Sequence, residues 1–355
     1  MDRDLTTPEI IKNVRQQSQS LAGVLQHQCE AGKSSLLRAA SLIQNHKRIL
    51  ITGMGASLFS ALPLEYFLCS QGFDATAIEA GELLHYLNSG PSDMVVIMVS
   101  RSGSSVEIAK LIELLSPANP IIGVTNEPDG PLARVAHTSI LIGSQCDEMV
   151  AIQTYTGTVL ALYLLGCAVT NKLDNGVREA SRILPHFSEL VSECLQNCEN
   201  WDSFLDPRSP VHLLARGSSM ASAFEGALLF NEVAKHPSCA MPVASFRHGP
   251  VEQVDSSFRA LLFAGSDRTR NLNLALARDI KAFGGGIRVI GNPQPDDPDV
   301  EWSVLPDVPE PLLPLFEIVP LQLAAVRMAQ LRGLPLGVFR YAPQVALDET
   351  RFGNE

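Results

Sequence analysis

The sequence predicts an α/β protein built from two tandem copies of one unit, each a parallel sheet flanked by helices. A buried strand runs into a glycine-serine loop and then a helical pattern in residues 49–57, and again about 162 residues later in residues 211–219. The stretch Pro-Ile-Ile-Gly-Val-Thr-Asn at residues 120–126 is echoed by Gly-Ile-Arg-Val-Ile-Gly-Asn at residues 286–292. Strands and helices alternate, as in parallel sheets with right-handed crossovers.

The first half begins with helices predicted over residues 7–45, where Pro8 follows two threonines as at a helix start. Helices are also expected at residues 57–70 and 104–115. The apolar run at residues 94–99 is typical of a central parallel strand covered on both faces. The first sheet is expected to use residues 48–52, 75–79, 94–99, 120–125 and 139–142.

The second half begins after a mostly helical stretch at residues 154–191, which we expect to link the two copies. A last helix is predicted at residues 314–332, before a tail. The second sheet is expected to use residues 211–214, 239–243, 259–263 and 287–290. The predicted divisions are N-terminal helices 1–34, a first copy 35–175, a helical linker 176–200, a second copy 201–335 and a C-terminal tail 336–355.

Composition excludes several classes of function. The 355 residues carry a net charge of -11, which argues against a nucleic-acid or anionic-membrane surface. The start of the chain is polar where a signal peptide would be apolar, and no run of 18 apolar residues spans a membrane. Seven cysteines in no ligand-like pattern fit a reduced cytoplasm without a structural metal. We expect no cofactor.

The first candidate site is the loop Gly53-Met54-Gly55-Ala56-Ser57. Glycine allows a sharp turn, and the start of the following helix offers unpaired N–H groups to a phosphate, so Gly55, Ala56 and Ser57 are candidate phosphate ligands. A dinucleotide fingerprint would need a third glycine where Leu58 stands, which disfavours a dehydrogenase. A turn needed only for packing is the other interpretation.

The second candidate site, Ser100-Arg101-Ser102-Gly103-Ser104-Ser105, directly follows the apolar strand at residues 94–99. Ligands of open α/β sheets bind at that edge. Hydroxyls and helix N–H groups can hold a phosphate, and Arg101 could add a bidentate contact. Helix capping explains one serine but not a cluster of four.

Two further segments carry polar groups. Residues 148–154 form a turn between sheet and helix, for which a helix cap is the simple interpretation. Glu225 and Glu232 lie seven residues apart, on one face of a largely apolar helix, where a carboxylate is costly unless it is paired or functional. Glu232 is therefore a candidate base or a member of a buried salt bridge. His248 precedes Gly-Pro in a loop, where most histidines are merely exposed.

Taken together, these motifs resemble the sugar isomerase (SIS) family, and most closely the isomerase half of the glucosamine-6-phosphate synthases. The motifs are Gly-x-Gly-x-Ser, Ser-x-Ser-Gly-x-Ser/Thr, Glu-Gly-Ala-Leu followed by Glu, and His-Gly-Pro. The likeness covers the chain from about residue 35 to the tail. It implies two SIS subdomains, each a flavodoxin-like three-layer sandwich, and a homodimer with its sites at the interface.

The resemblance also implies roles for individual residues in binding a hexose 6-phosphate. Ala151 and Gln153 would line the sugar site, and Glu225 would support it. Glu232 would move the proton between sugar carbons 1 and 2, and His248, reaching across from the partner subunit, would open the ring. The phosphate would be bound by Ser57, Ser100, Arg101, Ser102 and Ser105.

The chain departs from the synthases in three places. It begins Met1-Asp2-Arg3, and we expect neither their catalytic cysteine nor their glutaminase domain. Leu229 stands where their Glu-Gly-Ala-Leu-Lys helix has its lysine. Gln344 aligns with a tail lysine that forms a Schiff base with the sugar, and no lysine follows Lys281.

The expected chemistry is therefore acid–base catalysis without a lysine nucleophile. It fits aldose–ketose isomerisation of a hexose 6-phosphate, or deamination of an amino-hexose 6-phosphate, of the type that converts glucosamine 6-phosphate to fructose 6-phosphate. Deglycation of a phosphorylated fructosamine is an alternative. A sensor that binds phosphosugars without turnover is the rival from another class, although pure binding would need only the serine loops.

Overall fold

A computed structural model describes residues 8–86, 93–115, 119–294, 297, 299–341 and 346–350. The chain divides into two compact units. The first lobe comprises Gln16–Leu184 and Phe339–Glu355, and the second lobe comprises Met1–Arg15 and Pro185–Val338. Helices α1 (Glu9–Cys29) and α9 (Leu173–Gln196) each contribute residues to both lobes. The finer domain boundaries drawn from the sequence stay predictions.

The sheet of the first lobe has five parallel strands in the order β2-β1-β3-β4-β5, and all five were predicted. Every residue of the central strand β3 is buried, as its apolar sequence requires. The strand order reverses between β1 and β3. From β1 the chain adds β2 on one side of the sheet, and it then crosses to β3 and adds β4 and β5 on the other side. The strands are β1 (Arg48–Gly53), β2 (Asp74–Glu79), β3 (Met94–Val99), β4 (Ile121–Thr125) and β5 (Thr138–Leu141).

The second lobe repeats this connectivity, with parallel strands in the order β10-β9-β8-β6-β7. The edge strand β10 was not predicted, because Glu301-Trp302-Ser303-Val304 is partly exposed and lacks an apolar run. The strands are β6 (Val211–Ala215), β7 (Ser238–Pro242), β8 (Arg259–Phe263), β9 (Gly286–Gly291) and β10 (Glu301–Val304). The prediction of two tandem α/β copies is therefore confirmed.

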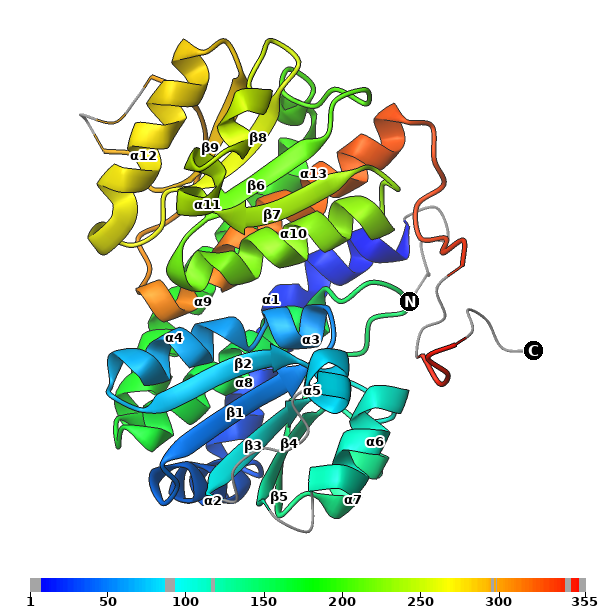
Figure 1. The fold of residues 1–355 in the computed structure, drawn as a ribbon, viewed down its shortest axis with the longest axis vertical. Coiled ribbons are helices and arrows are strands. Elements are labelled where there is room, and N and C mark those ends of the chain that lie inside the picture. The colour runs from blue at the N-terminus through cyan, green and yellow to red at the C-terminus, as the bar shows by residue number, and fades with distance from the viewer. Residues whose placement is uncertain are drawn as a thin grey trace. The chain divides into compact units, whose positions relative to one another are not determined.

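Helices cover both faces of the first sheet (Figure 1). One layer contains α2 (Lys33–Gln44), α4 (Leu62–Ser70) and α8 (Gln153–Val169), and the other contains α5 (Ala80–Tyr86), α6 (Val106–Leu115) and α7 (Pro131–Val135).

The helix predicted at residues 57–70 is two helices, α3 (Ala56–Phe59) and α4. Pro63, which has no N–H to donate, stands at the start of α4 and favours a new helix there.

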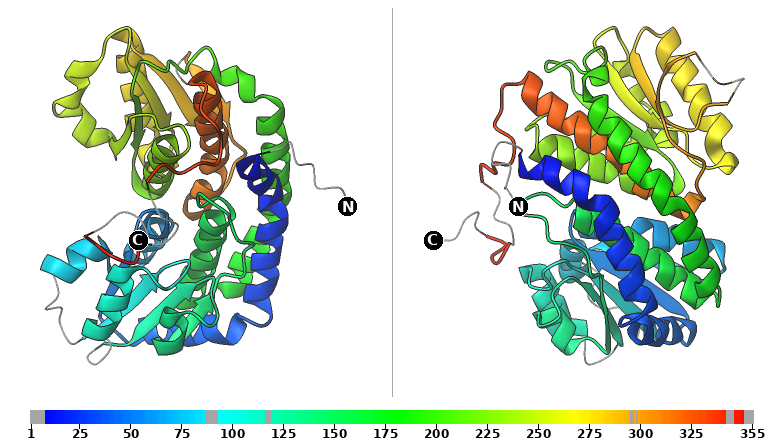
Figure 2. Two further views of the ribbon diagram at one scale, coloured as in Figure 1. Left: turned by 90° about the vertical axis from the view of Figure 1, so that its right-hand side faces the viewer. Right: turned by 180° about the vertical axis from the view of Figure 1, so that it is seen from behind.

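The second sheet is covered in the same way, as the views in Figure 2 also show. Helices α10 (Met220–Glu232) and α13 (Leu313–Leu331) pack together on one face. On the other face α11 (Val243–Arg247) and α12 (Asp267–Ala282) enclose an apolar core that includes Phe246, Phe258 and Leu262. Single turns of 3₁₀ helix lie at Cys198–Trp201, Gly217–Ser219, Pro250–Gln253 and Glu310–Leu312.

Within the residues that the structure describes, one helical stretch, Glu310–Leu331, is long and apolar enough to cross a membrane by length and composition. Its most apolar window is 89% buried within the structure. The stretch contains α13, which packs against α10, so burial in the core of the second lobe accounts for its apolar sequence.

Candidate active site

The two serine-bearing loops of the first lobe follow the carboxyl ends of neighbouring strands. Gly53, the last residue of β1, is in register with Val99, the last residue of β3. Neighbouring strands lie about 4.8 Å apart, so the loops that follow them start side by side. They flank the point where the strand order reverses, which is where open α/β sheets bind ligands.

The first loop needs its glycines for structural reasons. A Cβ on Gly53 would lie 2.7 Å from the carbonyl oxygen of Val99, and Gly55 has a φ of 48°. The packing interpretation thus accounts for both glycines. It does not account for Ser57, whose partly exposed hydroxyl has no hydrogen-bond partner among the described residues. The neighbouring Ala56 is also partly exposed.

The second loop is held in place by its own hydroxyls and by the end of β4. The buried Ser100 Oγ accepts a hydrogen bond from the Gly103 N–H at 3.1 Å. Thr125 Oγ1 donates to the Arg101 carbonyl at 2.9 Å, and the Asn126 N–H donates to the same oxygen at 3.0 Å. The backbone of this loop is therefore fixed before any ligand binds.

The four serines of this loop do different work. Ser100 accepts a hydrogen bond within the turn, and Ser104 donates its hydroxyl to the Ser102 carbonyl at 3.0 Å, so both have structural roles in the loop, although neither accepts from the first N–H groups of α6. Ser102, Ser105 and Arg101 are partly exposed. In the part of the chain that the structure describes, neither the Ser105 hydroxyl nor the Arg101 guanidinium has a side-chain partner. These groups remain available to a phosphate.

The start of α8 is occupied by a residue that sequence reasoning missed. The Asp147 carboxylate accepts hydrogen bonds from the N–H groups of Ile152, Gln153 and Thr154 at 2.9–3.0 Å, and from Thr154 Oγ1 at 2.7 Å. The helix-cap interpretation of this turn is therefore correct for the backbone. Only the pattern of an aspartate shortly before an apolar helix could have indicated it.

The predicted sugar-site residues of this turn differ in burial. Ala151 is partly exposed, whereas Gln153 is only 1% exposed. The side-chain oxygen of Gln153 is buried and has no hydrogen-bond partner within the described residues. A buried acceptor without a donor is costly, so this oxygen is suited to a ligand hydroxyl.

Helix α10 of the second lobe carries both predicted carboxylates. Glu225 lies on its buried face and is 1% exposed. The glycine of the same motif is structural, because a Cβ on Gly226 would lie within 2.7 Å of Leu213 and Leu321. Glu232 is the last residue of the helix and is partly buried. Burial raises its pKa to about 7, against the opposing effect of Lys235.

Lys235 is a second residue that the sequence analysis did not single out. Its φ is 49°, a left-handed conformation that is uncommon outside glycine. Its ammonium group donates to the carbonyl oxygen of Glu232 and to that of Val338, the latter at 2.6 Å. A positive charge is thereby fixed beside the candidate base.

His248 caps the C-terminal end of α11 and is exposed. Helix α10 ends with Glu232 shortly before β7 begins at Ser238, whereas α11 follows the end of β7 at Pro242. Glu232 therefore lies toward the amino end of β7 and His248 toward its carboxyl end. The strand between them spans about 16 Å. The second lobe of one chain does not bring these two predicted catalytic side chains together.

The glycine-serine loop of the second lobe differs from that of the first. Gly217 has a φ of 58°, like its counterpart Gly55. Ser219 Oγ and Ser222 Oγ each donate a 2.7 Å hydrogen bond to the carboxylate of Glu317 on α13. The repeated pattern predicts an anion site at this loop, and the place is taken by a carboxyl group of the chain itself.

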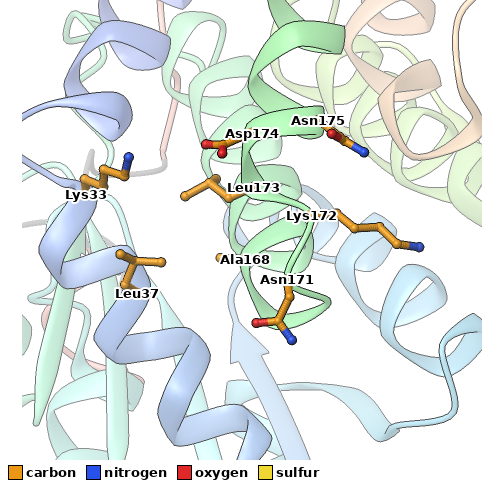
Figure 3. Close-up of a pocket in the computed structure, with 8 residues that line it drawn as sticks. All are labelled: Lys33, Leu37, Ala168, Asn171, Lys172, Leu173, Asp174 and Asn175. Carbon is orange, nitrogen blue, oxygen red and sulfur yellow. The ribbon is translucent and has the colours of Figure 1, made fainter.

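A pocket of about 390 Å³ lies elsewhere in the first lobe (Figure 3). It is lined by residues of α2, of the end of α8, of the turn that follows and of the start of α9, and it contains no candidate site residue. Over the described ranges, no group of three His, Cys, Asp or Glu side chains is placed to hold a metal ion.

Comparisons with known proteins agree with this architecture. A family model described as the SIS domain matches residues 42–168 and 205–332. A Pyrococcus horikoshii protein named glutamine–fructose-6-phosphate aminotransferase [isomerizing] is 26% identical over 308 residues, which cover 83% of this chain and 51% of that protein. The chain thus spans about half the length of the curated relatives it matches.

Solved structures show the same fold at low sequence identity. The C-terminal domain of glucosamine-fructose-6-phosphate aminotransferase from Francisella tularensis has a TM-score of 0.82 at 20% identity, over 95% of this chain and 99% of that one. A glucosamine-6-phosphate deaminase from Thermotoga maritima has a TM-score of 0.69 at 17% identity, over 92% and 95%. The chain therefore belongs to the SIS-domain family and contains two copies of that domain.

Proposed function

We propose that this protein is a phosphosugar enzyme that performs aldose–ketose isomerisation of a hexose 6-phosphate or deamination of an amino-hexose 6-phosphate. The observation that carries the proposal is Glu232, a partly buried carboxylate whose pKa is raised to about 7. A general base works best when its pKa lies near the working pH. The names of the relatives, an isomerizing aminotransferase and a deaminase, support the same chemistry.

The phosphate of the substrate binds to the serine loops of the first lobe. Ser57, Ser102 and Ser105 donate hydroxyl hydrogen bonds to it, and Arg101 adds a charge-assisted bond. Ser100 keeps the turn in shape while its own hydroxyl hydrogen stays available. The buried oxygen of Gln153 accepts a hydrogen bond from a sugar hydroxyl, beside Ala151.

The reaction proceeds by proton transfer on the open-chain sugar. His248 assists ring opening, Glu232 removes the proton from carbon 2, and the same carboxyl group returns it to carbon 1. If carbon 2 carries an amine, the proton transfer gives a ketimine. Water adds to the ketimine, and a ketose 6-phosphate and ammonia are released. Glu225 supports the base from the preceding turns of α10.

The active unit is a homodimer in which His248 comes from the partner subunit. The placement of Glu232 and His248 toward opposite ends of the strands of their sheet supports this arrangement. A heterodimer experiment tests it. Mixing Glu232→Gln subunits with His248→Ala subunits should restore part of the activity that each variant lacks alone, and no restoration would contradict shared sites.

The test of the function is a panel of hexose and amino-hexose 6-phosphates, monitored for both ketose formation and ammonia release. Glu232→Gln should lower kcat by about 10²- to 10⁴-fold, with ligand affinity little changed, because only proton transfer is lost. The matched control is Glu199→Gln, which changes an exposed glutamate of the same lobe.

The same panel separates the enzyme from a sensor. A sensor would bind a phosphosugar without turnover, and Glu232→Gln would then behave like the wild type toward every compound. That outcome would overturn the catalytic proposal.

A further inference from the structure

The loop of the second lobe contains a buried carboxylate that the proposed reaction does not use. Glu317, on α13, is 1% exposed and receives one hydrogen bond from Ser219 Oγ and one from Ser222 Oγ, each at 2.7 Å. The two hydroxyls lie 98 and 95 residues away in the sequence. Among the described residues, no Lys, Arg or His forms an ion pair with Glu317.

The two hydroxyls occupy repeated positions. An offset of 162 residues relates Gly217 to Gly55, Ser219 to Ser57 and Ser222 to Ser60, and both glycines have positive φ. In the first lobe Ser60 Oγ donates to the Ser57 carbonyl at 2.8 Å, and Ser57 Oγ is left without a described partner. In the second lobe both hydroxyls turn to one carboxylate.

The helix that supplies the carboxylate is also a repeated element. Helix α13 is the last helix of the second copy and packs against α10, as α8 does against α3 in the first copy. Near its start α8 carries Gln153, whose buried oxygen lacks a partner, whereas α13 carries Glu317, whose two oxygens are both bonded. Helix α8 contains no carboxyl group, whereas Glu317 of α13 is bonded to both hydroxyls of the second copy.

The surroundings of Glu317 fit a side chain that permanently occupies this loop. Burial raises the pKa of Glu317 to about 7, while the bonds from Ser222 and Ser219 lower it and Glu310 raises it. Glu310 also approaches the loop, because a Cβ on Gly217 would lie 3.2 Å from its carboxylate oxygen. Glu317 therefore occupies the hydroxyl donors, and the carboxylate of Glu310 adds negative charge that would repel a phosphate.

We propose that the Glu317 carboxyl group is the built-in occupant of the second SIS copy's loop, held where the equivalent loop of the first copy is open to a phosphate. The carboxylate closes the second loop to ligands and fastens the start of α10 to α13. The site is one that takes a carboxylate, and it becomes vacant when the Glu317 side chain is shortened. This inference concerns binding and stability alone, so it can fail or succeed whatever reaction the protein catalyses.

The experiment is chemical rescue with formate. Glu317→Ala removes the carboxylate and leaves both hydroxyl donors, so sodium formate should raise its Tm saturably, beyond the effect of sodium chloride at equal ionic strength. The wild type and Glu317→Gln should show no such difference, because their sites are filled. Glu225→Ala, which removes another buried carboxylate from α10, is the matched control and should not respond to formate.

Refolding extends the test to a variant that is too unstable to purify. Glu317→Ala diluted from urea should give more soluble protein in formate than in chloride, and Glu225→Ala should not. If formate and chloride have equal effects on both the Tm and the refolding yield of Glu317→Ala, the proposal is overturned. A formate response of equal size in the wild type would overturn it as well.

Discussion

The two copies of the SIS domain share strand order and a glycine-serine loop, yet the equivalent hydroxyls of Ser57 and Ser219 differ, because among the described residues only that of Ser219 has a hydrogen-bond partner. Ser57 is partly exposed, whereas Ser219 and Ser222 are bonded to the buried Glu317. The copies also differ after their third strand. The first has four serines at residues 100–105, and the second has only Ser266 at residues 264–269.

This difference indicates how the two copies of a duplicated domain can take different roles. Under the proposed function the first copy supplies the phosphate site. The second copy supplies carboxylates on α10, a helix fastened at one end by Glu317 and bordered at the other by Lys235. A loop whose hydroxyls are bonded to the chain's own carboxyl group is cross-linked to α13 and has no free donors for a bound anion.

The largest effect is expected when the first loop is given the chemistry of the second. Ser57→Glu should place a carboxylate where the phosphate binds and weaken hexose 6-phosphate binding about 1000-fold, because like charges at close range cost several kcal/mol. Isothermal titration calorimetry measures the affinity. Ser57→Gln, of similar size but neutral, should lose much less, and equal losses in both variants would show that bulk rather than charge is responsible.

A smaller loss is expected at Arg101. Arg101→Met removes a charge-assisted hydrogen bond, which corresponds to an affinity loss of about 30-fold. The loss should shrink as salt is raised, because added ions screen the guanidinium of the wild type. Arg268, which is exposed in the first turn of α12 after the corresponding strand of the second copy, provides the control. If Arg268→Met weakens binding as much as Arg101→Met, Arg101 has no special role.

Sequence reasoning succeeded where the structural role of a residue depends on residues next to it in the sequence. Strand β3 was predictable because a strand covered on both faces is apolar throughout. The two serine loops were predictable because each directly follows such a strand. The short, half-exposed edge strand β10 has no comparable pattern.

The residues that sequence reasoning missed owe their roles to contacts made in three dimensions. Glu317 meets hydroxyls 95 and 98 residues away, and Lys235 meets Val338 across 103 residues. Asp147 acts locally, but aspartates near helix starts are common. Gln344, which replaces the tail lysine of the synthases, lies outside the described residues. The tail nearby does contact the first lobe, where the Ala346 carbonyl accepts from the Val106 N–H at 3.1 Å.

Lys235 offers a finer test of the second copy as the source of the base. The ammonium group favours the charged form of Glu232, so Lys235→Met should raise the pKa of that carboxyl group above about 7. The acid limb of the kcat profile should move to higher pH by the same amount, and Lys235→Arg should restore it. A lower kcat with an unmoved acid limb would mean that Lys235 acts only on the backbone.

The smallest effect concerns stability, and it separates the filled loop from an ordinary core contact. Burial raises the pKa of Glu317 from 4.5 to about 7, so between these values the folded protein holds a proton that the unfolded chain releases. Stability is therefore greatest at low pH in this window and falls as pH rises toward about 7. Glu232 contributes in the same direction.

Glu317→Gln keeps a hydrogen-bonding side chain but cannot ionise, so its Tm should fall less than that of the wild type between pH 5 and about 7.5. Scanning calorimetry at constant ionic strength measures the difference, with Glu199→Gln as the control. Parallel curves for the wild type and Glu317→Gln would mean that Glu317 is ionised in the folded protein as it is in the unfolded chain, so that burial does not raise its pKa.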